Sequence, residues 1–380
     1  MRILVLTHEF PPIGGGGGRV AQDIATGLAA RGHELRVLTT HLDDLPLSEQ
    51  VNGVQVERLP CGRKTAFRAS LAEMARYNLQ AFNVGRQFLQ AGSTWRPELI
   101  HAHFAVPAGA AAIALSRLGR IPYVLTIHLG DVPGAVPEKT DRWFKWIYPF
   151  TPPIWQGAAG VVAVSEFTKK MALRHYTVPM QVILNGVDLA SLPARASGAC
   201  AEPRIVFAGR FMEQKNPEHL VQALVRLRDL PWRCAMLGDG PLLESVSASV
   251  AANGLNERIS LPGWVTPAQV LEKFAHSDLL VLPSRSEGLS VVGVQALGMG
   301  LAMLLSDAGG NLELVSDGEN GFIFPAGDVD ALTAQLRRLL ENPSMLQSAQ
   351  SKSREMAQKY DLPAIVTQYE KLFTTLKSKI

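Results

Sequence analysis

Short runs of aliphatic and β-branched residues alternate with segments whose apolar residues recur every three or four positions, along almost the whole chain. Continuous apolar runs are typical of strands buried on both faces, and helices between them indicate parallel sheets. The pattern therefore predicts an α/β protein built from doubly wound parallel sheets. The expected strands are 3–7, 34–40, 54–59, 99–102, 123–127, 160–164 and 181–184, then 204–208, 233–237, 258–261, 279–282, 302–305 and 322–324.

Two domains are expected, because 380 residues exceed what one α/β core accommodates. The segment 186–203 is rich in Ala, Ser, Pro and Gly and carries no strand or helix pattern, and a new strand-turn-helix series starts after it. We therefore predict a first domain over 1–188 and a second over 189–363. Residues 364–380 predict an amphipathic helix that packs back on the first domain.

The composition indicates in which cellular compartment we expect the protein. No stretch approaches 18 consecutive apolar residues, and the opening apolar run ends early at His8 and Glu9, so neither a transmembrane helix nor a signal peptide is expected. The three cysteines are widely spaced and form no Cys-x-x-Cys pair, which argues against a zinc site or a disulfide framework. We expect a cytoplasmic protein, with membrane association at the inner face as an open option. No dense basic stripe or known motif indicates nucleic-acid binding.

Five consecutive glycines, Gly14 to Gly18, separate the first strand from its helix. Glycine backbone can approach an anion closely and the helix N-terminus adds positive potential, so phosphate binding is favoured over a flexible solvent loop. The run does not fit a dinucleotide fingerprint, which would need glycine where Arg19 or Val20 stands. It is not a P-loop either, because no Gly-Lys-Ser/Thr follows.

A second candidate site follows the first strand of the second domain. Gly209-Arg210 and Lys215 place two cations at the carboxyl end of a strand, where open α/β sheets bind ligands. Arg210 offers a fork of N–H donors and Lys215 a point charge, which together suit a diphosphate. Taken alone, the pair fits a solvated surface equally well.

A third candidate site, residues 283–296, combines a carboxylate, a glycine turn and an apolar helix. Backbone amides at the start of that helix can hold a phosphate, and Glu287 can accept hydrogen bonds from sugar hydroxyls. Gln295 lies eight residues further on, about two helical turns, and is expected to face the same way. A capped helix with a surface Glu is the alternative.

A fourth candidate site ends a strand of the first domain with the sequence Thr-Ile-His-Leu-Gly-Asp, which contains His128 and Asp131. Polar side chains at the carboxyl end of a strand suit contact with a substrate. A structural histidine is the alternative.

With these motifs in this order on two doubly wound domains, the chain resembles glycosyltransferase family 4, retaining enzymes of the GT-B fold, over nearly its whole length. The resemblance implies two Rossmann-like domains that face each other across a cleft, the first on the acceptor side and the second binding a nucleotide sugar. The segments that carry it are 14–18, 128–131, 185–188, 209–215, 237–241, 263–265, 284–288, 309–313 and 317–321.

The resemblance also implies a role for each matching position. Arg210 and Lys215 would bind the donor diphosphate, Glu287 would contact the donor sugar, and His128 would lie near the anomeric carbon. The other donor-side residues are Gly15, Gly16, Gly17, Gly209, Gly263, Trp264, Val265, Gly288, Leu289, Ser290, Val291 and Gln295. The acceptor-side residues are Arg19 and Asp131.

The implied activity is metal-independent transfer of a hexosyl unit, with retention, from a nucleoside-diphosphate sugar to a hydroxyl acceptor. A glycan or a lipid-linked intermediate of cell-envelope polysaccharide synthesis is the expected acceptor. No cofactor beyond the nucleotide-sugar co-substrate is expected.

One position departs from the family pattern, because Gln295 stands where the family has the second Glu of its Glu-x7-Glu signature. A Gln can still pair with ribose hydroxyls, but a charge-assisted bond of about 1.5–3 kcal/mol is lost. We therefore expect weakened or altered donor binding. A nucleotide-sugar 2-epimerase and a degenerate nucleotide-sugar-binding module are the alternative interpretations.

Two segments raise the question of a membrane. Residues 141–155 contain three of the six tryptophans, and residues 63–86 carry five basic residues among apolar positions. Trp beside basic side chains suits an anionic membrane surface or a lipid-linked acceptor. A helix packed into the domain core is the alternative.

Overall fold

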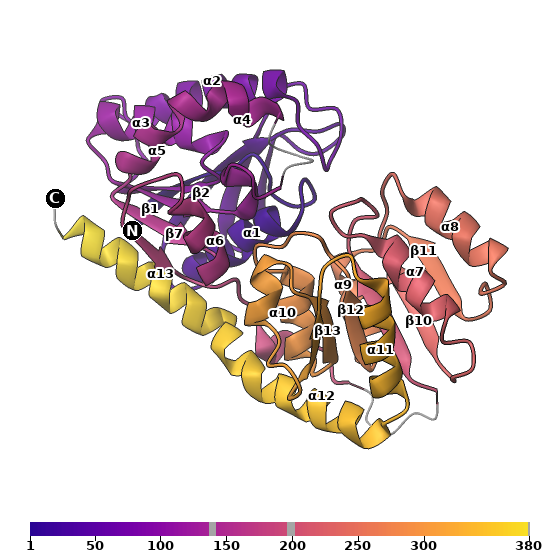
Figure 1. The fold of residues 1–380 in the computed structure, drawn as a ribbon. Coiled ribbons are helices and arrows are strands. Elements are labelled where there is room, and N and C mark those ends of the chain that lie inside the picture. Colours follow the sequence, from indigo (N-terminus) through magenta and orange to yellow (C-terminus); the bar gives the residue numbers. More distant parts are fainter. Residues whose placement is uncertain (137–141, 196–201, 379–380) are drawn as a thin grey trace. The chain divides into compact units, whose positions relative to one another are not determined.

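The computed structural model describes residues 1–136, 142–195 and 202–378, which form two compact units. Unit 1 comprises Met1–Gly186 with Leu362–Ile380, and unit 2 comprises Val187–Asp361. Each unit is a mostly parallel sheet covered by helices (Figure 1). The prediction of two doubly wound, Rossmann-like α/β domains is confirmed.

The sheet of unit 1 has eight strands in the order β3-β4-β2-β1-β5-β6-β7-β8. They are β1 (Arg2–Leu6), β2 (Glu34–Thr40), β3 (Ser48–Val51), β4 (Val54–Leu59), β5 (Leu99–His103), β6 (Tyr123–Ile127), β7 (Gly160–Ala163) and β8 (Met180–Val182). Because β2 and β5 flank β1, the strand order reverses between β1 and β5. Open α/β sheets bind ligands beyond the carboxyl ends of the strands at such a reversal.

Helices cover both faces of this sheet. They are α1 (Gly16–Ala29), α2 (Leu71–Gln87), α3 (Ala108–Gly119), α4 (Arg142–Ile147), α5 (Pro152–Gln156), α6 (Glu166–Ala172) and α13 (Leu362–Lys377). Residues of α2, α3 and α5 join one core cluster with Ile100 and Ala102 of β5. His101, which points to the opposite face, contacts the Tyr369 and Phe373 rings of α13.

The C-terminal helix α13 packs on α1 within unit 1 (Figure 1). Gly27 makes the approach close, because a Cβ there would lie 2.5 Å from Cγ2 of Val366. At its C-terminal end, Lys377 Nζ lies 2.5 Å from Glu98 Oε1, on the loop that enters β5.

The edge strand β3 was not expected from the sequence. Its residues Ser-Glu-Gln-Val are mostly polar, so no apolar run marks them, and the strand pairs antiparallel with β4 through a two-residue loop. Asn52 and Gly53 in that loop have φ of 47° and 83°. Asn-Gly with both residues left-handed is the strongest short hairpin signal, and it could have identified β3.

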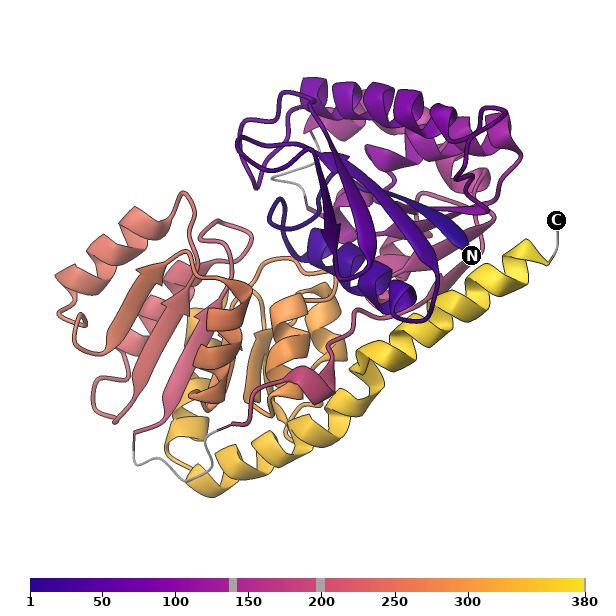
Figure 2. The same ribbon diagram turned by 180° about the vertical axis from the view of Figure 1, so that it is seen from behind.

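The sheet of unit 2 has six parallel strands in the order β11-β10-β9-β12-β13-β14, seen from behind in Figure 2. They are β9 (Arg204–Ala208), β10 (Arg233–Leu237), β11 (Ile259–Gly263), β12 (Leu279–Leu282), β13 (Ala302–Ser306) and β14 (Gly321–Phe324). This is the order 3-2-1-4-5-6 of a dinucleotide-binding fold, with its reversal between β9 and β12. The helices are α7 (Pro217–Val225), α8 (Leu243–Ala252), α9 (Pro267–Ala275), α10 (Val291–Gly298), α11 (Val329–Leu340) and α12 (Pro343–Ala357).

Two further observations concern the cysteines and the possibility of a membrane-spanning helix. Cys61 and Cys234 are free and buried, and Cys200 lies outside the described residues. Within the described ranges, no helix is both long enough and apolar enough to cross a membrane.

Candidate active site

The reversal point of unit 2 brings together the two segments that carry Lys215 and Glu287. One segment follows β9 and the other follows β12, and these strands are neighbours in the sheet. Lys215 Nζ lies 2.5 Å from Glu287 Oε1, and Ser284 Oγ donates to the same oxygen at 2.7 Å. Both residues are largely shielded from solvent. A carboxylate and an ammonium therefore meet where this fold binds ligands.

Hydrogen bonds from the backbone and from one side chain connect the two segments. Arg285 N–H donates to Gln214 O at 2.7 Å, and the Gln214 side-chain amide donates to Ser286 O at 3.0 Å. Gly310 N–H donates to Glu287 O, and any Cβ at Gly310 would overlap the carbonyl of Gly288. The loop after β13 thus closes tightly on the turn that carries Glu287.

Arg210 lies in the loop directly after β9, half-buried beside Gly209. Gly209 N–H donates to Leu237 O at the end of β10, and a Cβ at Gly238 would overlap the Gly209 carbonyl. Gly238 N–H in turn donates to Gly263 O at the end of β11. The loops after β11, β10 and β9 therefore pack in sequence along one edge of the sheet, up to Arg210.

The helix α10 presents its N-terminus to the same edge. Ser290 is the N-cap, and its Oγ accepts the Gly293 N–H at 3.2 Å. The first N–H groups of a helix have no intrahelical acceptor, so this end can meet an anion. Leu289 and Ser290 are buried, and Val291 is half-buried.

The spacing argument for Gln295 is wrong. Glu287 lies in a loop and α10 begins at Val291, so the eight residues between Glu287 and Gln295 do not span two helical turns. Gln295 is half-buried in the second turn of α10. Trp264 is exposed and Val265 half-buried in the loop that leaves β11.

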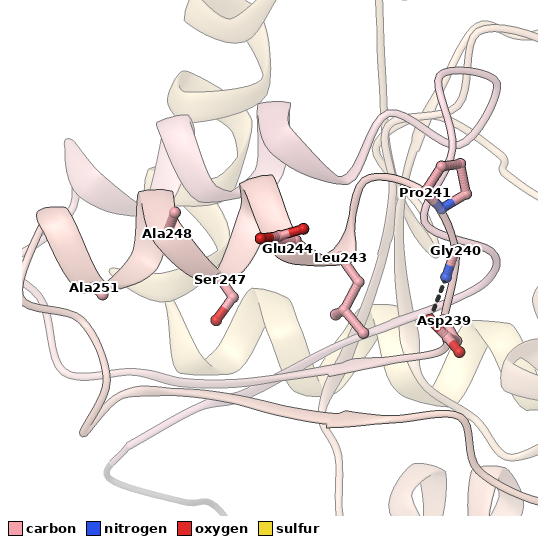
Figure 3. Close-up of a pocket in the computed structure, with 8 residues that line it drawn as sticks. All are labelled: Asp239, Gly240, Pro241, Leu243, Glu244, Ser247, Ala248 and Ala251. Atoms are coloured by element: carbon pink, nitrogen blue, oxygen red, sulfur yellow. Dashed lines mark hydrogen bonds between the residues drawn. The ribbon is translucent and has the colours of Figure 1, made fainter.

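A surface depression in unit 2 does not coincide with these residues. It is lined by Asp239, Gly240 and Pro241 and by one side of α8, as Figure 3 shows. The Asp239 carboxylate turns back to accept the Gly240 N–H at 2.6 Å, so it caps its own loop. None of the predicted site residues lines this depression.

In unit 1, His128 lies at the carboxyl end of β6 and is buried. Its ring packs against Phe104 after β5, with ring centroids 4.4 Å apart. Burial lowers the pKa of His128 to about 4, although Glu9 raises it somewhat. The imidazole is therefore neutral near pH 7, and among the described residues Nε2 has no hydrogen-bond partner.

Asp131 positions His128. Its Oδ2 accepts the His128 N–H at 2.9 Å, its Oδ1 accepts the Val106 N–H at 3.2 Å, and the side chain is buried. The carboxylate thereby fixes the turn after β6 against the loop after β5. These bonds make Asp131 a positioning residue for His128, and its expected contact with an acceptor stays a prediction.

The glycine run is built around Glu9, a residue that sequence reasoning missed. Glu9 Oε2 accepts the Gly15 N–H at 3.1 Å, and a Cβ at Gly14 would overlap the Glu9 side chain. At Gly17 a Cβ would lie 2.5 Å from Phe104 Cζ and 3.3 Å from His128 Nδ1. Gly15 and Gly16 are exposed at the start of α1. The run therefore carries its own carboxylate at the helix N-terminus, where a phosphate was expected.

Two other residues of unit 1 complete this edge. Phe104 has φ of 71°, an unusual conformation for a bulky residue that often marks a functional site. Arg19 is partly exposed and pairs with Asp23 one turn along α1, at 2.8 Å. His8, Glu9, Phe104 and His128 thus gather at the carboxyl ends of β1, β5 and β6.

Two doubly wound units of this kind are the architecture of the GT-B glycosyltransferases, and comparison with known proteins supports that class. The family described as Glycosyltransferase Family 4 matches residues 14–191, and the family described as Glycosyl transferases group 1 matches residues 198–359. The two matches together span almost the entire chain. The chain belongs to glycosyltransferase family 4.

Individual relatives are distant in sequence and close in fold. The glycogen synthase of Mycobacterium tuberculosis is 25% identical, over 99% of this chain and 95% of its own. Sucrose-phosphate synthase from Thermosynechococcus elongatus has a TM-score of 0.87 at 20% identity, with both chains fully covered. Anabaena HepE in complex with UDP-glucose has a TM-score of 0.78 at 19% identity, covering 99% of this chain and 100% of that chain.

Proposed function

We propose that this glycosyltransferase moves a hexosyl unit, with retention of configuration, from a nucleoside-diphosphate sugar to a hydroxyl of a glycan or lipid-linked acceptor. The observation that carries the proposal is the contact between Lys215 and Glu287 at the strand-order reversal of unit 2. An ammonium suits a diphosphate and a carboxylate suits sugar hydroxyls, so the pair matches both parts of such a donor.

The hydrogen bond between Lys215 and Glu287 leaves other polar atoms of both side chains to bind the nucleotide sugar. An ammonium has three N–H donors and Lys215 spends one on Glu287, so two can reach diphosphate oxygens. Lys215 and Ser284 both donate to Oε1 of Glu287, and neither of these bonds uses Oε2. Oε2 would accept a sugar hydroxyl, while Arg210 and the first amides of α10 would hold the phosphates.

In the proposed reaction, the bond between the anomeric carbon and the diphosphate oxygen breaks, and the acceptor oxygen bonds to the anomeric carbon from the same face. The acceptor proton passes to the departing diphosphate. Arg210 and Lys215 would stabilise the negative charge that develops on the leaving group, which is usually the largest catalytic contribution. The scheme uses no metal ion.

His128 suits the positive character of the sugar in such a transition state. Its lowered pKa, caused by burial, keeps the imidazole neutral, so it adds no positive charge beside an oxocarbenium-like carbon. In unit 1 it would serve as a hydrogen-bonding group for the sugar or the acceptor.

Replacing Arg210 by alanine tests the proposal. With a donor that binds the wild type, we expect kcat to fall about 100-fold or more, as for loss of one charge-stabilising group. Lys273→Ala, an exposed lysine on α9, is the matched control and should keep full turnover. Unchanged turnover in Arg210→Ala would overturn the assignment.

The stereochemistry and reaction class need a separate readout. NMR of the product should show the anomeric configuration of the donor, and an inverted product would refute retention. Conversion of the donor alone, without acceptor, into an epimeric nucleotide sugar would instead identify a 2-epimerase.

A further inference from the structure

We infer that unit 1 binds an anionic membrane surface through the outward face of α2 together with α4 and the turn after it. This surface, the α2–α4 surface, consists of exposed apolar and exposed basic side chains. Its members are Arg68, Leu71, Arg76, Leu79, Arg86, Lys145, Trp146 and Phe150. The inference deepens the proposed function, because it names the source of a lipid-linked acceptor.

The helix α2 has one buried side and one exposed side. Tyr77, Ala81 and Gly85 face the core at intervals of four residues. Leu71 and Leu79 lie on the opposite side, 47% and 62% exposed, in the same stripe as Arg86. A helix that presents leucine and arginine together to solvent has the composition of an interfacial membrane helix.

The segment around α4 adds large aromatic side chains. Trp146 and Phe150 are 78% and 75% exposed, more than any other large apolar side chain in the described parts of the chain. Ile154 and Trp155, just beyond them, are buried in the same core cluster as Tyr77 of α2. The helices α2 and α5 therefore cover the same face of the sheet of unit 1, and α4 adjoins α5 through the turn Tyr148–Phe150, near α2 in the view of Figure 1. The alternative interpretation of this segment, a helix packed into the domain core, therefore applies to Trp155, which is buried, and does not apply to Trp146, which is exposed.

The positive charge of the α2–α4 surface favours an anionic partner. Glu73 is the sole acidic residue between Glu57 and Glu98, and it is buried as the capping partner of Ser70. Within the described ranges no carboxylate forms a salt bridge with Arg76, Arg86 or Lys145.

Exposed cations beside exposed Trp and Leu fit lipid phosphates and acyl chains. A second copy of the chain would place like charges against each other, which disfavours a dimer at this surface.

Not every basic residue of the segment belongs to this surface. Arg63 is buried, and its guanidinium donates to the carbonyls of His8 at 2.8 Å and Ala66 at 2.8 Å. It ties the loop before α2 to the end of β1. The α2–α4 surface therefore begins beyond Arg63 in the chain.

Vesicle sedimentation tests the inference with the full chain and no substrate. We expect binding to phosphatidylcholine vesicles that contain phosphatidylglycerol, and none to pure phosphatidylcholine. Each cation near an anionic surface contributes about fivefold, so Arg76→Ser/Arg86→Ser should bind about 25-fold more weakly. The control Lys273→Ser/Lys371→Ser removes two exposed cations elsewhere and should bind as the wild type. Equal weakening in both double variants would overturn the inference, because binding would then follow net charge alone.

Tryptophan fluorescence tests insertion at the predicted place. Brominated lipids quench a tryptophan that enters the bilayer, so we expect quenching in the wild type that is lost in Trp146→Phe. Trp264→Phe, which removes the exposed tryptophan of unit 2, should keep the quenching. Absence of vesicle binding, or quenching that survives Trp146→Phe, would refute the inference. A dimer in solution that Leu79→Ser dissolves would refute it in favour of self-association. None of these results depends on donor binding, so failure here leaves the proposed transferase activity standing.

Discussion

Lys215→Met removes the cation that neutralises Glu287 while keeping an apolar stem of similar length. The carboxylate would then stay buried, and among the described residues the Ser284 hydroxyl would remain as the donor to Oε1. Breaking a buried ion pair on one side costs about 3–5 kcal/mol, because an uncompensated charge remains. Lys215 keeps some exposure, so we expect about 2 kcal/mol, or a Tm about 4–8 °C lower for a unit of this size.

The double variant separates this mechanism from simple loss of packing. Lys215→Met/Glu287→Gln removes both charges, so its Tm should recover at least half of the loss caused by Lys215→Met alone. Scanning calorimetry of the three variants without ligand measures the cycle. Lys352→Met, which removes a partly exposed lysine paired with Glu355, should leave Tm unchanged. If the two single losses simply add in the double variant, the reasoning about an uncompensated charge is refuted.

Three further predictions concern unit 1. Gly17→Ala forces a Cβ to within 2.5 Å of Phe104 Cζ and should cost about 1–3 kcal/mol of stability by overpacking. Gly130→Ala, with open space around it and no positive φ, should not lower Tm in the same thermal scan. Glu9→Gln keeps an acceptor for Gly15 N–H and removes a negative charge near the helix N-terminus. If the glycine run binds a nucleoside diphosphate, calorimetric titration should show about fivefold tighter binding of that anion. Unchanged affinity would mean that the glycine run does not bind it. His103 is fully buried, and burial lowers its pKa well below 6.5. As the pH falls, this histidine therefore takes up its proton in the unfolded chain before it does so in the folded protein. Stability should fall as the pH drops below about 6.5, by up to about 1.4 kcal/mol per pH unit. His103→Leu should flatten the dependence of Tm on pH in that range, and an unchanged slope would contradict this.

Most strands of the two sheets were predictable because each is a short continuous run of apolar residues, whereas apolar residues recur only every three or four positions in the helices around it. Strands such as 34–40, 204–208 and 279–282 have the predicted bounds. The polar strand β3 escaped, since edge strands need no apolar run and its hairpin signal lies in two loop residues. Periodicity reports burial, so it identifies the centre of a sheet better than its edge.

The candidate site was partly predictable for a similar reason. Position at the carboxyl end of a strand identified Lys215, Glu287 and His128 one at a time, and the strand order explains why the first two meet. Glu9 escaped because a lone carboxylate before two prolines has no local pattern, and its role follows from the glycines that fold around it. The Gln295 spacing failed because the helix starts later than the motif.

A thermal-shift panel of UDP-, GDP- and ADP-sugars without added metal tests the central claim most directly. At a hundredfold excess over Kd, a donor should stabilise the protein by about 2.7 kcal/mol. The account predicts that sugars of one base raise Tm and that the same donor then releases nucleoside diphosphate in the presence of an acceptor. No shift and no release with any donor would contradict the account and favour a degenerate binding module.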